Sequence, residues 1–258
     1  MKNISTVKNC YGCGVCATIC GRKIIEIRQN TDGFYEPHIT DEAKCSTCGL
    51  CLDVCAYLHD ELSLKDCTIN SYAAWSKDHL IRRKCSSGGA GFEIGKYLIE
   101  RGYKVCGVRY DAEKNRAEHY IASTVDELVQ SAGSKYIQSY TVDGFKAISR
   151  KEKYLVTGTP CQIDSFRRYI QRFHCEDNFV LLDFFCHGVP SMLLWKKYTE
   201  WAEKKVGKIT YASWRNKWTG WHDSWAMGID GKEHGVKIDW HDSYDMLIRE
   251  KKSYLESR

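Results

Sequence analysis

The spacing of apolar and polar positions divides the chain into two regions. In the first region, residues 1–68, apolar positions come in short runs between cysteines, and residues 24–40 alternate around Asp32-Gly33. An Asp-Gly pair between two alternating runs is a strong hairpin signal, so we expect two short antiparallel strands there. The second region, residues 69–258, has longer periodic runs.

Apolar runs and helical stripes alternate in the second region. Strands are predicted at 72–76, 103–109, 154–157 and 179–185. Helices are predicted at 89–101, 162–171 and 191–204. A strand, a helix and a further strand in succession are typical of a βαβ unit, whose strands lie parallel in one sheet. We therefore expect an α/β domain with a mixed, partly parallel sheet.

Eight of the 14 cysteines form an internal repeat in the first region. It reads Cys10-x-x-Cys13-x-x-Cys16-x-x-x-Cys20 and then Cys45-x-x-Cys48-x-x-Cys51-x-x-x-Cys55. In bacterial ferredoxins, three closely spaced thiolates bind one 4Fe-4S cluster and the fourth binds the other cluster. The predicted ligands are Cys10, Cys13, Cys16 and Cys55 for cluster one, and Cys20, Cys45, Cys48 and Cys51 for cluster two. We expect an α+β ferredoxin-like domain with two 4Fe-4S clusters over residues 1–68.

Residues beside the cysteines agree with this interpretation, with one departure. Gly12, Gly14 and Gly49 leave backbone amides free to approach the cluster sulfides and tune the reduction potential. Gly21 and Ala56 stand where a proline usually follows the fourth cysteine of a run. The alternative, two unrelated zinc sites, would use paired Cys-x-x-Cys units instead of overlapping triples.

Composition and charge narrow the function classes. The 258 residues are 43% hydrophobic and 28% charged, as in a soluble globular protein. The formal charge is +5, but the basic residues occur in short pairs and each cluster would add negative charge, so nucleic acid is not a predicted partner. The sequence has no long apolar run and no signal-peptide core. We expect a cytoplasmic protein without a transmembrane segment, whose cysteines bind metal in a reducing compartment.

Three loops carry candidate chemistry, because ligands of α/β folds gather at the carboxyl ends of strands. They are Cys85-Ser86-Ser87-Gly88-Gly89-Ala90, Thr157-Gly158-Thr159-Pro160-Cys161-Gln162 and Cys186-His187-Gly188-Val189-Pro190-Ser191. The first offers free amides and a helix dipole to phosphate. Each loop alone is also compatible with ordinary turn and helix-cap chemistry, but three together favour a binding site. Neither a Gly-x-Gly-x-x-Gly run nor a Walker loop occurs, so a flavin would be held in another way.

At these loops the chain resembles the beta-subunit family of coenzyme F420-reducing hydrogenase and dehydrogenase. That family joins a ferredoxin domain to an α/β domain with a Ser-x-Gly-Gly loop, a Ser-Lys-Tyr-x-Gln-Ser segment, a Gly-Thr-Pro-Cys-Gln loop and a Cys-His-Gly-Val-Pro-Ser loop. All four occur here in the family's order, at 86–89, 134–139, 158–162 and 186–191. The resemblance covers the whole chain and identifies residues 69–258 as an FAD domain of this type.

The resemblance implies that FAD links a hydride partner to the clusters. The residues implied beside the flavin phosphates or ring are Ser86, Ser87, Gly88 and Gly89, with Lys135 as a positive partner. Those implied against the ring are Thr159, Pro160, Cys161 and Gln162. Cys186 and His187 would bind a further cluster or shuttle a proton, or are a buried thiol and a satisfied histidine.

The C-terminal part departs from the family pattern. Members often continue into a segment with a Cys-x-x-Cys pair, whereas this sequence stops at Arg258, so we interpret it as a short member without a third cluster built that way. Four tryptophans upstream recur at helical spacing, although a Thr-Gly pair among them favours strands and turns. They are Trp214, Trp218, Trp221 and Trp225.

The leading hypothesis is an iron-sulfur flavoprotein oxidoreductase. It would pass electrons through FAD between the 4Fe-4S clusters and a hydride carrier, either coenzyme F420 or another organic acceptor. Its partner would be a redox protein or a hydrogenase or dehydrogenase subunit. The alternatives are a non-catalytic electron-transfer adaptor that has lost the flavin, and the remnant of an interrupted gene. No residue identifies the acceptor, because a fold does not fix a function.

Overall fold

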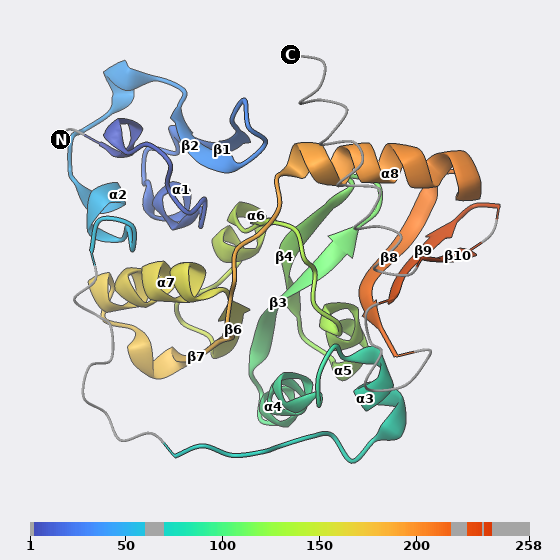
Figure 1. Cartoon of the computed structure of the whole chain (residues 1–258). Helices are drawn as coiled ribbons and strands as arrows, with labels where there is room; N and C mark the ends of the chain where they lie inside the picture. Colours follow the sequence, from blue (N-terminus) through green and yellow to red (C-terminus); the bar gives the residue numbers. More distant parts are fainter. Residues whose placement is uncertain (1–2, 60–69, 218–225, 234, 239–258) are drawn as a thin grey trace.

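The structure is a computed structural model that describes residues 3–59, 70–217, 226–233 and 235–238. The predicted domain boundary between residues 68 and 69 lies outside these residues. The N-terminal region occupies one end of the molecule, against the side of the larger α/β region that carries α6 and α7 (Figure 1). Among the described residues, no helix is both long and apolar enough to cross a membrane.

The N-terminal region is built from short elements around a hairpin. They are η1 (Ile4–Thr6), α1 (Val15–Ile19), β1 (Ile25–Gln29), β2 (Tyr35–Ile39), η2 (Glu42–Lys44) and α2 (Leu50–Asp53). Strands β1 and β2 pair antiparallel, with Ile25 opposite Ile39, which confirms the predicted hairpin. Helices α1 and α2 each begin after a glycine with a positive φ, 74° at Gly14 and 78° at Gly49, so the sequence repeat recurs as a repeat of structure.

The α/β region contains a five-stranded mixed sheet in the order β5-β4-β3-β6-β7. Its strands are β3 (Lys104–Asp111), β4 (Arg116–Ala122), β5 (Ser139–Tyr140), β6 (Tyr154–Gly158) and β7 (Phe179–Asp183). Strands β3, β6 and β7 run parallel, as do β4 and β5, while β3 and β4 form an antiparallel pair. The predicted mixed, partly parallel sheet is therefore confirmed.

Helices cover both faces of this sheet. They are α3 (His79–Lys84), α4 (Ala90–Ile99), α5 (Val125–Leu128), α6 (Val142–Lys146) and α7 (Pro160–Arg172), with the short turns η3 (Val129–Ser131) and η4 (Glu176–Asn178). Val105 and Leu155 pack toward α4 and α5, whereas Cys106 and Val156, their neighbours in sequence, pack toward α6 and α7. This alternation is the two-residue period of a strand buried on both faces.

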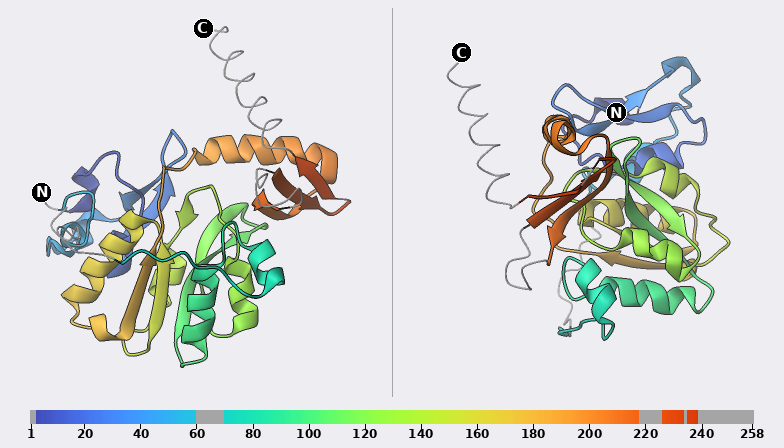
Figure 2. Two further views of the ribbon diagram at one scale, coloured as in Figure 1. Left: turned by 60° about the horizontal axis from the view of Figure 1, so that its bottom comes forward. Right: turned by 90° about the vertical axis from the view of Figure 1, so that its right-hand side faces the viewer.

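A second, three-stranded sheet packs with the long helix α8 (Met192–Val206). Its strands are β8 (Ile209–Asn216), β9 (Ala226–Gly231) and β10 (Gly235–Ile238), joined antiparallel in the order β10-β9-β8 (Figure 2). Trp195 on α8 and Trp214 on β8 pack with their ring centroids 4.9 Å apart. Trp214 thus lies on a strand and in the core, and the other three tryptophans of the spaced set lie outside the described residues.

Two strand predictions differ from the structure. Residues 72–76 form no strand, because this segment runs over the loop at 86–89 instead of joining the sheet, and the Ser76 N–H donates to the Gly88 carbonyl. Strand β7 ends at Asp183, two residues before the predicted end. Strand β4 was not predicted, because the consecutive polar residues Glu118 and His119 interrupt its apolar pattern although both are buried.

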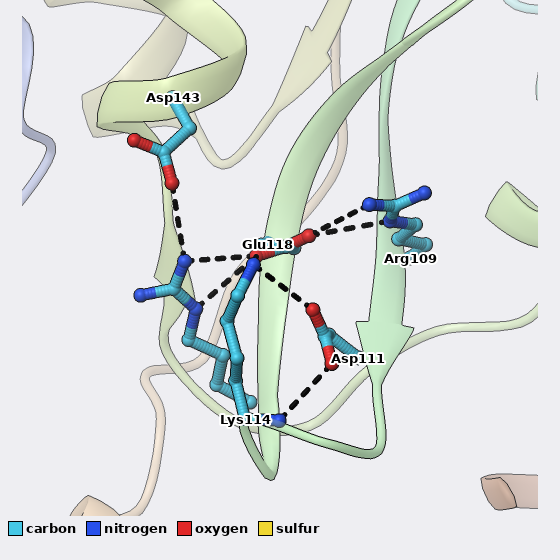
Figure 3. A network of polar contacts seen from close by, with 6 residues as sticks. Arg109, Asp111, Lys114, Glu118 and Asp143 are labelled. Carbon is cyan, nitrogen blue, oxygen red and sulfur yellow. Dashed lines mark hydrogen bonds and ion pairs between the residues drawn. The ribbon is translucent and has the colours of Figure 1, made fainter.

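Glu118 is buried because three cations surround its carboxylate (Figure 3). Arg116, Lys114 and Arg109 each donate to it, at 2.8, 3.0 and 2.9 Å. Burial alone would raise the pKa of Glu118, but these three hydrogen bonds outweigh it and lower that pKa. The Arg116 guanidinium also lies 4.1 Å from the centroid of the Tyr140 ring, which connects this network to the end of β5.

Candidate functional site

The eight repeated cysteines separate into two sets of four around two cavities. One cavity, of about 20 Å³, is lined by Cys10, Cys13, Cys16 and Cys55. The other, of about 350 Å³, is lined by Cys20, Cys45, Cys48 and Cys51. These are the two sets that the repeat predicts, each with three thiols from one run and the fourth from the other run. We call them the cluster-one cavity and the cluster-two cavity.

The donor set of each cavity fits an iron-sulfur cluster. Four thiols surround each cavity, together with apolar side chains such as Val54 and Ile39. Within the residues that the structure describes, no three His, Cys, Asp or Glu side chains converge closely enough to bind a single metal ion, so the thiols are spread around the cavity walls. Four thiolates that enclose a volume are the donors a 4Fe-4S cluster requires.

The two cavities differ in their exposure. Burial raises the pKa of the Cys13 thiol to about 12, and burial together with the neighbouring thiols of Cys13 and Cys10 raises that of Cys16 well above its ordinary value. Around the cluster-two cavity, Cys48 is exposed and only Cys51 is buried. The thiols around the cluster-one cavity would therefore lose their protons only when bound iron supplies a compensating positive charge.

Side chains of the α/β region hold the loop of the cluster-one cavity. The Gln138 amide donates to the Tyr11 carbonyl at 3.2 Å and accepts from the Tyr35 N–H at 2.7 Å. The Thr141 hydroxyl donates to the Cys13 carbonyl at 2.8 Å. All three bonds join residues more than 100 positions apart in the chain. They fix the first cysteine run against β5 and the start of α6.

The glycines of this loop allow that close approach. A Cβ at Gly12 would overlap the Gln138 amide and the Tyr35 carbonyl, and a Cβ at Gly14 would overlap the Thr141 hydroxyl. Gly49, the equivalent of Gly14 in the second run, has a similar positive φ, but a Cβ there would meet no atom within 4 Å. Gly12 and Gly14 therefore have a packing role that the repeat alone does not indicate.

The segment 134–139 connects the predicted flavin loops with one another. At one end, the Ser134 N–H donates to the Ser86 hydroxyl at 2.7 Å. At the other end, the Ser139 hydroxyl accepts from the Gln162 amide at 2.9 Å. Since Gln138 in the same segment binds the cluster-one loop, this segment contacts the loop at 86–89, the loop at 158–162 and the first cysteine run.

The loop at 86–89 presents a helix start. Helix α4 begins after Gly89, which has a φ of 88°, and no side chain caps its first turn. The amides of such a turn are free for an anion, which fits a phosphate of FAD. A Cβ at Gly88 would lie 2.7 Å from the Ala74 carbonyl, so this glycine is needed for packing against the preceding segment.

Two lysines lie near this loop: Lys135 directly follows Ser134, whose N–H binds Ser86, and Lys217 binds the loop backbone. The Lys135 ammonium donates to the carbonyls of Gln130 and Ala132, and its burial lowers its pKa to about 7. Lys217, which follows β8, donates to the carbonyls of Arg82 and Ser87, both at 2.7 Å. Lys135 is a predicted flavin residue, whereas sequence reasoning missed Lys217, which adds positive charge on the underside of the same loop.

The other two loops lie at the ends of neighbouring parallel strands. Thr159 begins α7 with a capping box in which Gln162 is the third helical residue, so both residues are fixed by their own helix start. Cys161 and Cys186 are close enough that the Cys186 charge adds to burial in raising the pKa of Cys161. His187 is exposed. The predicted groups at 159–162 and 186–187 therefore share one edge of the sheet.

The third loop is also anchored to the N-terminal hairpin. The Ser191 hydroxyl donates to the Asp32 carbonyl at 2.5 Å, and the Met192 N–H donates to the Gly33 carbonyl at 2.9 Å. The tip of the predicted Asp-Gly hairpin thus meets the start of α8 (Figure 1). This contact could not be found from either sequence motif alone, since each is complete as a local turn or cap.

Sequence comparison places these motifs in one family. Residues 71–145 match the profile for the N-terminal part of the coenzyme F420 hydrogenase/dehydrogenase beta subunit, and residues 151–254 match the profile for its C-terminal part. The chain belongs to the coenzyme F420 hydrogenase/dehydrogenase beta-subunit family. Residues 9–58 match a 4Fe-4S dicluster domain, so this member of the family has an iron-sulfur, electron-transferring part.

Two known proteins resemble this beta-subunit family member. The coenzyme F420-dependent sulfite reductase of Methanocaldococcus jannaschii is 24% identical over 164 residues, which is 62% of this chain and 25% of that protein. A chain of the F420-reducing [NiFe] hydrogenase complex from Methanosarcina barkeri superposes with a TM-score of 0.43 and 17% identity, over 66% of this chain and 60% of that one. The chain therefore spans about a quarter of the reductase that it matches.

Proposed function

We propose that this protein is an iron-sulfur flavoprotein oxidoreductase in which FAD exchanges electrons with cluster one, and cluster one with cluster two. The proposal rests on one observation. The segment 134–139 is bonded to the loop at 86–89, to the loop at 158–162 and to the cysteine loop of cluster one. A flavin held by those two loops would therefore lie beside the cluster-one cavity.

The residues proposed to hold FAD are those of the two loops and the lysine between them. They are Ser86, Ser87, Gly88, Gly89, Lys135, Thr159, Pro160, Cys161 and Gln162. The uncapped start of α4 would bind a phosphate through backbone amides, and the negative charge of that phosphate would favour the protonated form of Lys135, whose pKa is otherwise about 7. When bound, FAD can exchange a hydride with a carrier and single electrons with the clusters.

The two cavities suggest an order for the relay. The cluster-one cysteines lie against the α/β region, whereas Cys48 at the cluster-two cavity is exposed. We infer that cluster one faces the flavin and that cluster two faces an external redox protein, such as a partner in a hydrogenase or dehydrogenase. The first hydride carrier to test is coenzyme F420, because the similar reductase is named for its dependence on it.

Anaerobic purification with iron, sulfide and flavin quantitation tests the proposal. We expect about eight irons, eight sulfides and one flavin per chain, as two 4Fe-4S clusters and one FAD require. Reduced coenzyme F420, a reduced nicotinamide cofactor and reduced ferredoxin would then be compared as donors, with cluster bleaching as the signal. Protein that holds eight irons but no flavin after reconstitution would be an electron-transfer adaptor, and the proposal would be wrong.

A matched pair of lysine variants tests the flavin site itself. Lys135→Met removes the half-buried ammonium next to Ser134, which binds Ser86, and is expected to lose most of the flavin while keeping eight irons. Lys104→Met removes an exposed lysine whose partner is Glu152, 2.7 Å away, and is expected to keep both. Equal flavin content in the two variants would remove Lys135 from the site.

A further inference from the structure

Ser165 on α7 connects the two parts of the predicted cluster-one ligand set. Its side chain is fully buried. Its hydroxyl oxygen lies 3.2 Å from the Cys13 sulfur and accepts from the Ala56 N–H at 3.1 Å. Cys13 belongs to the first cysteine run, and Ala56 directly follows Cys55, the fourth cysteine of the second run. One side chain of the α/β region therefore contacts both runs at cluster one.

We propose that Ser165 is a positioning residue that donates a hydrogen bond to the Cys13 sulfur when cluster one is bound. This proposal rests on the proposed function, because it requires the cluster. A thiol at Cys13 donates to Ser165, but a thiolate ligand has no proton to donate, so the direction must reverse. The Ala56 N–H already occupies an acceptor position on the hydroxyl, which leaves the serine proton to point at sulfur.

The residue that follows Cys55 fits this role. A proline at position 56 would have no N–H and would leave the Ser165 oxygen without this donor. The alanine found there supplies the N–H that orients the hydroxyl. The departure from the usual proline thus has a structural use at position 56. At the equivalent position in the other run, a Cβ built on Gly21 would meet no atom within 4 Å, so this position is not packed against the α/β region as Ala56 is.

The position of Ser165 gives the hydrogen bond a consequence for electron flow. Ser165 and Cys161 are four residues apart on α7 and so lie on the same helix face. On that face, Cys161 is a predicted flavin contact, and Ser165, one turn later, contacts the Cys13 ligand of cluster one. A hydrogen bond to a ligand sulfur stabilises the reduced, more negative cluster and raises its potential. Ser165 would therefore favour electron transfer toward cluster one.

Cluster two has a comparable donor that serves as an internal reference. The Asn3 amide lies 3.5 Å from the Cys45 sulfur, and Asn3 is buried in the N-terminal region. Since Asn3 and Ser165 contact cysteines of different predicted clusters, removing each side chain should shift the reduction potential of a different cluster. Comparing the two variants therefore shows which reduction step belongs to which cluster, without mutating a cysteine ligand.

Redox titration followed by electron paramagnetic resonance, on the whole anaerobically purified chain, tests the proposal. Ser165→Ala should make cluster one about tenfold harder to reduce, which is about 59 mV for one electron, and should leave cluster two unchanged. Asn3→Ala should shift the other step instead. Ala56→Pro should shift cluster one in the same direction as Ser165→Ala by a smaller factor, while Gly21→Pro should leave cluster one unchanged.

The outcomes separate this inference from the proposed function. If wild-type protein does not load two clusters, the proposed function itself fails. If both clusters load and Ser165→Ala leaves both potentials unchanged, only the role of Ser165 is wrong. Should Ser165→Ala not load cluster one, Ser165→Thr decides: a wild-type potential supports the hydroxyl donor, and a second loss of the cluster shows that the serine acts through packing alone.

Discussion

The two cysteine runs have the same spacing but different surroundings. The first run lies against the α/β region and is held there through Gln138 and Thr141, and the second run borders the larger cavity, of about 350 Å³, and contains the exposed Cys48. A symmetric motif has thus become asymmetric through its neighbours. The spacing of the cysteines therefore predicts the cluster ligands, whereas the packing around each run determines which partner each predicted cluster can reach.

The largest expected difference between the runs concerns their glycines. Gly14→Ala and Gly49→Ala place a Cβ at equivalent positions with a similar positive φ, but only the first collides with Thr141. We expect Gly49→Ala to cost about 1–2 kcal/mol for the backbone alone. Gly14→Ala should cost roughly 3–5 kcal/mol, because steric overlap adds to the backbone cost. Thermal unfolding of the anaerobic proteins measures both, and equal losses would contradict the asymmetry.

A smaller effect should come from His119, which supports the first run indirectly. Gly144 of α6 packs directly on His119, and Thr141 lies at the start of the same helix. Burial lowers the pKa of His119 from 6.5 to about 4. Between these values the unfolded chain binds more protons than the folded one, so stability must fall as the pH drops.

The size of this loss can be checked with a single variant. From pH 7 to pH 5 the wild type should lose about 2 kcal/mol through His119, since one pKa unit is about 1.36 kcal/mol. His119→Gln keeps a donor for the Thr157 carbonyl, 3.1 Å from the imidazole Nε2, but does not titrate. Its urea midpoint should therefore change less between the two pH values. An identical pH dependence in both proteins would exclude this histidine as the cause.

The smallest expected effect is a difference in the rate of cluster loss. Cys48 is exposed at cluster two, whereas Cys16 and Cys55 are buried at cluster one. With an iron chelator under limited oxygen, cluster two should decay first, on the order of tenfold faster, as about 1.4 kcal/mol of opening free energy would give. Electron paramagnetic resonance during the exposure follows each cluster, and simultaneous loss would show that the two cavities are equally protected.

Much of the fold could be predicted because its signals are local. The hairpin at Asp32-Gly33 and the helix that begins near Pro160 follow from turn and cap chemistry within a few residues. Strand β4 could not be predicted, since the charge of Glu118 is compatible with burial only after three cations from separate chain positions surround it. The polar residues of β4 are therefore explained by this ion-pair network, which the spacing of apolar residues in the sequence does not reveal.

The candidate site, like the fold, could be predicted only where its sequence signals are local. The two cysteine sets around the two cavities match those that the repeat predicts, although the binding of clusters there stays a prediction. Gln138, Thr141 and Ser165 were not predicted to contact the cysteine loop. Their partners lie more than 100 residues away, and polar side chains of ordinary type give no local signal. One clue was available, the alanine at position 56 in place of proline.

The contact between the hairpin tip and the start of α8 limits which domains from other proteins could replace the N-terminal region. Ser191 and Met192 bind the backbone at Asp32 and Gly33, so the turn of the N-terminal region is part of the frame that positions the loop at 186–191. A dicluster domain from another protein would have to bring the same turn, and the close-packing glycines of the first run, to replace this one. The two regions are therefore exchangeable only as a pair.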